Sequence, residues 1–138
     1  MSTLAQIEQR LQALQQKGPQ AGDAGVLLEL AEEVLEQWVC ARGEEPTRAR
    51  REGFRLLALH HQGARGEPSF NACRESCREL VYHYNLLILE PDDPRSGARA
   101  RMMTLLANHL CLFVAGKLQA QPLGEFCCAS RPLRAAGE

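Results

Sequence analysis

The cysteines are the residues of this chain with the widest range of possible chemistry. Cys73 and Cys77 are four residues apart, so on a helix both side chains would point to one site, where a transition metal such as zinc could bind. The residues that could add further ligands are His83, His109 and Cys111. Zinc sites usually contain two short-spaced pairs such as CxxC, a pattern that this chain lacks. We therefore expect no cofactor and interpret both cysteines as buried small hydrophobes, with a metal-sensing or thiol-redox bundle as the alternative.

Two further cysteines, Cys127 and Cys128, are adjacent near the end of the chain. Neighbouring cysteines rarely bridge each other without strain, and the nearest cation is Arg131. We therefore favour a docked or inert tail over a redox or soft-metal site there.

An arginine-rich stretch follows the first third of the chain. Arg48, Arg51 and Arg55 could lie along a phosphate backbone, so a nucleic-acid binder using a helix at residues 48–65 is a third hypothesis. The acidic residues that dilute this charge are Glu44, Glu45 and Glu52. Because the formal net charge of the chain is −1, we favour a solvated face or ion pairs with an acidic helix over a phosphate-binding surface. The three arginines remain candidate partner-binding residues.

Tyr82 and His83 belong to the densest cluster of polar and aromatic residues in the chain. On a helix they point away from the apolar stripe, so they could reach a groove or a partner; the simpler interpretation leaves their polar tips in water. The motifs GxSxG, GxxxxGK[ST], GxGxxG and HExxH are absent. The sequence therefore does not indicate an enzyme, and we expect a non-catalytic protein.

Apolar residues recur at helical spacing along most of the chain and predict five helices. The first helix has a seam of Leu4, Ile7, Leu11 and Leu14 and ends at Gly18. The second extends from an Asp23 N-cap to Gly43, and the third follows Pro46 and ends at Gly63. The fourth extends from Pro68 to Glu90, and the fifth extends from Pro94, after an Asp93 cap, to about Gln119. On the third helix, the arginines are expected mostly on a different face from the apolar residues. The apolar stripe of the fourth comprises Phe70, Cys73, Cys77, Leu80, Val81, Tyr84, Leu87 and Ile88.

The fifth helix is apolar on both sides. One face carries Met102, Leu105, Leu106, Leu112 and Phe113, and the other carries Met103, Leu110 and Val114. Such a helix must be covered on both sides, either at the centre of a bundle or at a dimer interface, so we expect a homodimer rather than a monomer. His109 lies among these residues and is expected to form a hydrogen bond across helices.

The composition fits one all-α domain. The chain has 138 residues, 24% of them charged and only 5% aromatic, and it shows no sustained strand pattern. We expect a four- or five-helix antiparallel bundle at residues 1–121 with an apolar central C-terminal helix. The tail at residues 122–138 is expected to be partly docked, through Leu123 and Phe126, or flexible.

The first ten residues lack the pattern of a signal peptide, and no apolar run reaches the roughly 20 residues that cross a bilayer. We therefore expect a cytoplasmic protein with free thiols and no membrane association. The predicted function is a regulatory or interaction module that binds another protein through a helix face.

Overall fold

The prediction of an all-α domain is confirmed by the structure, a computed structural model that describes residues 2–120. Its helices are α1 (Leu4–Lys17), α2 (Ala24–Ala41), α3 (Arg55–Ala64), α4 (Arg74–Leu89) and α5 (Ser96–Ala120). Short 3₁₀ segments precede α2 and α4, at Ala21–Asp23 and Pro68–Cys73. Within residues 2–120 there is no strand, and one isolated antiparallel bridge pairs Arg51 with Phe54. In the same range, no helix is both long and apolar enough to span a bilayer.

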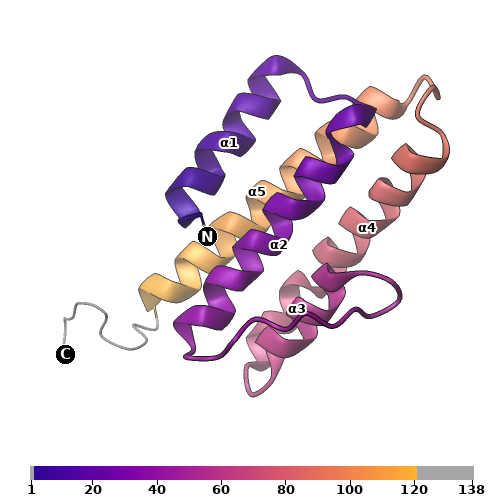
Figure 1. Cartoon of the computed structure of the whole chain (residues 1–138). Coiled ribbons are helices and arrows are strands. Elements are labelled where there is room, and N and C mark those ends of the chain that lie inside the picture. Colours follow the sequence, from indigo (N-terminus) through magenta and orange to yellow (C-terminus); the bar gives the residue numbers. More distant parts are fainter. Residues whose placement is uncertain (1, 121–138) are drawn as a thin grey trace.

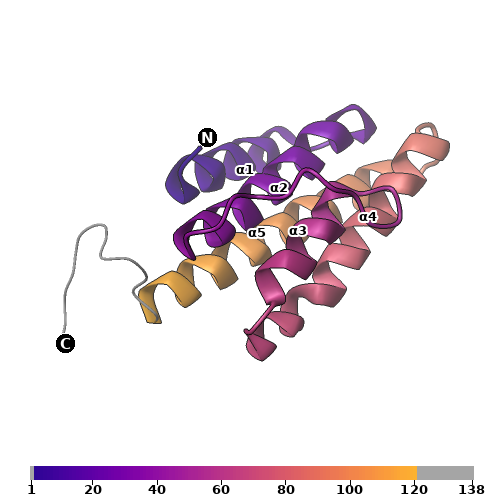
Figure 2. The same cartoon turned by 60° about the horizontal axis from the view of Figure 1, so that its bottom comes forward.

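The long helices form a bundle around a central pair, α2 and α5. These two helices lie against each other and point in the same direction, while α1 and α4 point the opposite way and each contact both of them (Figures 1 and 2). The helix α3 belongs to the crossover between α2 and α4 and packs against both. The expected central position of the fifth helix is therefore confirmed.

The predicted apolar stripes form most of the core. The seam of α1 buries Ile7 and Leu11, and the stripe around α4 buries both cysteines, Cys73 and Cys77. Ile88 is the exception, because it is exposed although Leu87 beside it is buried. Ile88 lies on nearly the same face of α4 as the buried Cys77, eleven residues earlier, but it is in the last turn of the helix, where residues 88–90 are all exposed. The predicted role of both sulfurs as core filler agrees with their burial.

Aromatic packing closes one end of the bundle, which we call the closed end: Trp38, His60, Gly63, Phe70 and Phe113. Trp38 stacks on Phe70 with ring centroids 5.1 Å apart, and Phe113 meets Phe70 edge-on at 5.4 Å. The Trp38 indole donates a hydrogen bond of 2.9 Å to the Gly63 carbonyl. A Cβ atom on Gly63 would lie 2.8 Å from Cδ1 of Trp38, so the missing side chain allows α3 to approach the indole this closely.

The segment between α2 and α3 corrects the prediction of a helix starting after Pro46. The helix α2 ends at Ala41, and Gly43 stops it as expected: its φ is 81°, its amide donates to the Cys40 carbonyl, and the Glu44 amide donates to the Val39 carbonyl. Residues 42–54 are then not helical.

A tight turn inside this segment is the physical reason for the error. Glu52 and Gly53 both have positive φ, 53° and 85°, and the backbones of Arg51 and Phe54 exchange hydrogen bonds of 3.0 and 2.9 Å. Two positive φ values in succession are typical of a type I′ turn, which cannot be part of a right-handed helix. The third helix therefore starts only at Arg55.

Two aspartates predicted to cap helices, Asp23 and Asp93, instead accept hydrogen bonds in the turn that precedes the helix. Asp23 precedes α2, but its carboxylate accepts from the Gln20 amide at 2.9 Å and from the Lys17 ammonium rather than from α2. Asp93 accepts from the Arg95 amide at 2.8 Å, and α5 begins at Ser96. In both places the aspartate closes the turn before the helix. The expectations for the tail, including Leu123, Phe126, Cys127 and Cys128, lie outside the described residues.

Candidate functional site

The three candidate arginines do not share a helix face, which corrects the expectation for residues 48–65. Arg48 and Arg51 lie in the segment between α2 and α3, and Arg55 is the first residue of α3. The Arg55 guanidinium binds the Glu36 carboxylate and lies 3.9 Å from Glu32, both on α2. The expected ion pairing with the acidic helix is thus present at Arg55, whose charge is balanced by carboxylates of the same protein.

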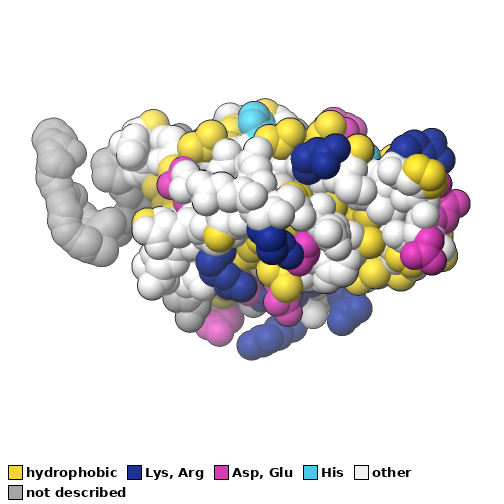
Figure 3. All heavy atoms as spheres, turned by 90° about the horizontal axis from the view of Figure 1, so that it is seen from above, with side chains coloured by type: hydrophobic (Ala, Val, Ile, Leu, Met, Phe, Trp, Pro, Cys, Tyr) yellow, Lys and Arg dark blue, Asp and Glu magenta, His cyan; other side chains and the backbone are white. Residues whose placement is uncertain are grey.

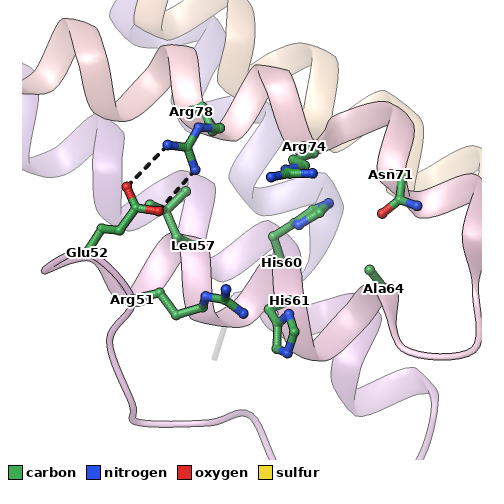
Figure 4. Close-up of a pocket in the computed structure, with 9 residues that line it drawn as sticks. All are labelled: Arg51, Glu52, Leu57, His60, His61, Ala64, Asn71, Arg74 and Arg78. Carbon is green, nitrogen blue, oxygen red and sulfur yellow. Dashed lines mark hydrogen bonds and ion pairs between the residues drawn. The ribbon is translucent and has the colours of Figure 1, made fainter.

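Arg51 instead lines a cavity of ≈ 240 Å³ between the turn at Glu52, α3 and α4. We call this cavity the basic pocket; its ionisable lining residues are Arg51, Glu52, His60, His61, Arg74 and Arg78. Figure 4 shows Arg51 extending from the turn towards His61, and Arg74 extending from α4 above His60. Three segments of the chain, the turn, α3 and α4, therefore bring cationic or ionisable side chains to one space.

The charges in the basic pocket are not balanced. Glu52 and Arg78 form two parallel contacts of 3.2 Å, and the hydrogen bond from Arg78 lowers the pKa of the Glu52 carboxyl. Within the part of the chain that the structure describes, the guanidinium groups of Arg51 and Arg74 have no hydrogen-bond or ion-pair partner. Because arginine stays charged at any physiological pH, the three guanidinium groups of Arg51, Arg74 and Arg78 face one carboxylate, Glu52, and two positive charges are in excess.

Two buried thiols lie next to the basic pocket. Sγ of Cys73 is 3.1 Å from the Phe70 carbonyl oxygen, and Nε2 of His60 is 3.0 Å from the same oxygen. A hydrogen bond with Cys77, and less strongly one with His60, lowers the pKa of Cys73 to about 6, although burial acts in the opposite direction. The pKa of Cys77 is raised by the same shared hydrogen bond and by burial. One of the two thiols therefore ionises more easily than the other.

The same contacts affect His60, which joins the thiols to the pocket. Burial alone lowers the pKa of the imidazole, but its hydrogen bonds with Cys73 and the Phe70 carbonyl outweigh burial, so the net pKa is raised. An ionised thiol is a nucleophile at neutral pH. Cys73 is only 1% exposed, however, so its sulfur is closed to reagents in this conformation.

Of the five predicted metal ligands, the structure brings together Cys73 and Cys77 but not the other three. Cys111 lies on α5 with its sulfur 3.7 Å from the Leu4 carbonyl, and His109 is exposed on the same helix, which corrects its expected hydrogen bond across helices. His83 is half-buried on α4 with its ring against Tyr82, and burial lowers its pKa. Among residues 2–120, no group of three or more histidine, cysteine or acidic side chains is placed to hold a metal ion. The five candidate ligands therefore do not form one site.

The second candidate surface is one side of α5, which we call the outer face: Met102, Leu105, His109, Leu112 and Gly116. These residues are spaced by three and four, as in a two-heptad seam. Met102 is 39%, Leu105 49% and Leu112 56% exposed, whereas Met103, Leu110 and Val114 are fully buried on the other side. Figure 3 shows hydrophobic side chains at the surface among the charged ones, gathered along the upper edge of that view.

Several residues of these surfaces escaped the sequence analysis, namely His60, Arg74 and Arg78. Arg74 and Arg78 are four residues apart, so their common helix face could have been read from the sequence. Tyr82, which was predicted to reach outward, is 60% exposed.

Comparison with known protein families, characterised proteins and solved structures finds no significant match to this chain. The candidate sites therefore depend on their own geometry.

Proposed function

We propose that this protein is a non-catalytic binding module that docks a helix of another protein on the outer face of α5. The observation that carries this proposal is the exposure of three large apolar side chains, Met102, Leu105 and Leu112, along one line of a helix. A patch of this kind exposes apolar area to water at a free-energy cost that a partner would remove. Heptad spacing suits a helix as the occupant.

The charges around the outer face indicate which helix would fit. The helix α5 contains no aspartate or glutamate in its 25 residues. Arg99 and Lys117 are bound to Glu90 and Glu67, but Arg101 is exposed beside Met102. We therefore propose a partner helix whose apolar seam is flanked by acidic side chains, because its charge would complement Arg101.

Free thiols support a proposal for the compartment. Cys40, Cys73, Cys77 and Cys111 are free, which suits a reducing compartment, so we propose that binding takes place in the cytoplasm. A second copy of this chain is the competing occupant of the outer face, since two α5 helices could pair through the same seam.

Photo-crosslinking tests the proposal at the resolution of single residues. A photoreactive amino acid is placed at position 112 on the outer face and, as a control, at position 12, which is exposed on α1. We expect position 112 to crosslink in cells to one segment of one other protein, an amphipathic helix with acidic flanks, and position 12 not to do so. The Leu105→Glu substitution should abolish that crosslink without unfolding the protein, because Leu105 is half exposed.

Two results would overturn the proposal. Crosslinks from position 112 that join only two copies of this chain, with light scattering at twice the monomer mass, would assign the outer face to a homodimer. Equal crosslinking from positions 12 and 112 would show that α5 has no binding preference.

A further inference from the structure

We propose that the basic pocket binds a doubly charged phosphate group. This inference is independent of the outer face, which lies on a different helix. The cavity of ≈ 240 Å³ has two positive charges in excess, because Arg51, Arg74 and Arg78 face the single carboxylate of Glu52. A phosphate dianion would balance both charges, whereas a carboxylate would leave one of them unmatched.

The donors around the cavity suit the several acceptor oxygens of phosphate. Arg51 and Arg74 each present a planar group that can donate two parallel hydrogen bonds to one phosphate. His60 and His61 line the space between them, and Figure 4 shows both rings on the same helix, α3. The raised pKa of His60 favours its charged form, so its ring adds positive charge to the cavity as the pH falls.

The fold holds the free arginines in place by local structure. The type I′ turn at Glu52 and Gly53 projects Arg51, and Glu52 in turn holds Arg78 through its two contacts. Glu52, the one carboxylate that lines the cavity among residues 2–120, is bound to Arg78 and also attracts Arg51 and Arg74, so a single negative charge is shared by three arginines. The local charge therefore remains available to an anion.

The phosphate could be free or could be carried by a phosphorylated side chain. Isothermal titration calorimetry with inorganic phosphate and with a short peptide containing one phosphoserine distinguishes these two sources. Equal affinity for the two probes assigns the pocket to the phosphate group alone, and tighter binding of the peptide assigns it to a phosphorylated protein segment. Either result supports the proposal, provided that acetate, which carries a single charge, and the unphosphorylated peptide both bind more weakly.

Substitutions place the binding in the pocket. Arg51→Gln and Arg74→Gln should each weaken phosphate binding about ten- to hundredfold, as expected for the loss of charge-assisted hydrogen bonds. Arg48→Gln is the matched control, because it removes the same charge from the same segment but lies outside this cavity, in a neighbouring one with Glu44 and Glu45. Arg48→Gln should leave the affinity within about twofold.

Two outcomes would overturn the inference. If neither probe binds at millimolar concentration, the basic pocket is not a phosphate site. If Arg48→Gln weakens binding as much as Arg74→Gln, the anion responds to the general charge of the surface rather than to the pocket. Leu105→Glu should not change phosphate binding, so failure here and failure of the proposed function can be told apart.

Discussion

The closed end of the bundle and the outer face of α5 use large apolar side chains in opposite ways. At the closed end, Trp38 and Phe70 are fully buried, and the indole nitrogen of Trp38 has its hydrogen-bond partner. On the outer face, Leu105 and Leu112 are about half exposed. Burial of apolar area stabilises the fold, whereas exposed apolar area becomes favourable only when a partner covers it. The difference separates residues that hold the fold together from residues available for binding.

Truncation of one large side chain in each region tests this separation most strongly. We expect Trp38→Ala to lower the free energy of unfolding by about 3–5 kcal/mol, because it leaves a cavity beside Phe70. Leu112→Ala should change it by less than about 0.5 kcal/mol, because half of that side chain is already in water. Urea unfolding followed by circular dichroism suits both variants, since Trp38 is the only tryptophan and its fluorescence is lost on substitution.

The contrast between the two variants is the decisive result. Similar losses from both would show that the outer face is part of the stabilising core in solution, for example because a second copy covers it. Repeating the measurement at several protein concentrations separates these cases, since the stability of a dimer depends on concentration.

Substitution of one glycine by alanine in each region, Gly63 in the closed end and Gly116 on the outer face, compares the two regions with an added methyl group. Gly63→Ala should destabilise the protein by about 1–3 kcal/mol, because its Cβ would meet Cδ1 of Trp38 at 2.8 Å. Gly116→Ala should stabilise it by about 0.4–1 kcal/mol, because this exposed helical position has open space and alanine favours a helix. Thermal and urea unfolding of the two variants should therefore shift in opposite directions. A loss of stability from both would contradict the open surroundings of Gly116.

The spacing of apolar residues was sufficient to predict those helices whose buried residues recur every three or four positions. The seam of α1 and the central position of α5 follow from apolar residues three and four apart. The third helix was predicted to start too early, because the apolar residues before Arg55 fit a helical period although the turn at Glu52 and Gly53 interrupts it. Glycine in that stretch was the available signal, and the positive φ of Glu52 was not readable from its residue type.

The basic pocket could not be predicted in the same way. Arg51, His60 and Arg74 come from a turn and two helices, and only tertiary packing brings them together. The sequence also does not indicate which arginines form ion pairs. Arg51 and Arg55 are close in sequence, yet Arg55 binds Glu36 and Arg51 does not. Residue type shows which charges are present, whereas the fold determines which of them are left without a partner.

A third region, the turn before α5, should give the smallest effect, because its contribution to stability is present at neutral pH and is lost only in acid. Hydrogen bonds from the Arg95 side chain and backbone lower the pKa of Asp93 to about 2, from an ordinary value of 3.8. A carboxyl with a lowered pKa in the folded state stabilises the protein fully above its unfolded pKa and loses that effect as the pH falls through its folded pKa. The contribution of Asp93 should therefore be complete above about pH 5 and decline towards pH 2.

Unfolding by urea between about pH 2 and pH 5 measures this decline. Asp93→Asn should make the free energy of unfolding less dependent on pH within that window, and added salt should reduce the difference from the wild type because Arg95 is largely exposed. Asp92→Asn is the control, since it removes an equal charge next to Asp93 from a side chain that has no hydrogen-bond or ion-pair partner among residues 2–120. If both variants flatten the curve equally, the acid sensitivity arises from the net charge of the protein, and the turn before α5 has no specific ion pair that stabilises the fold.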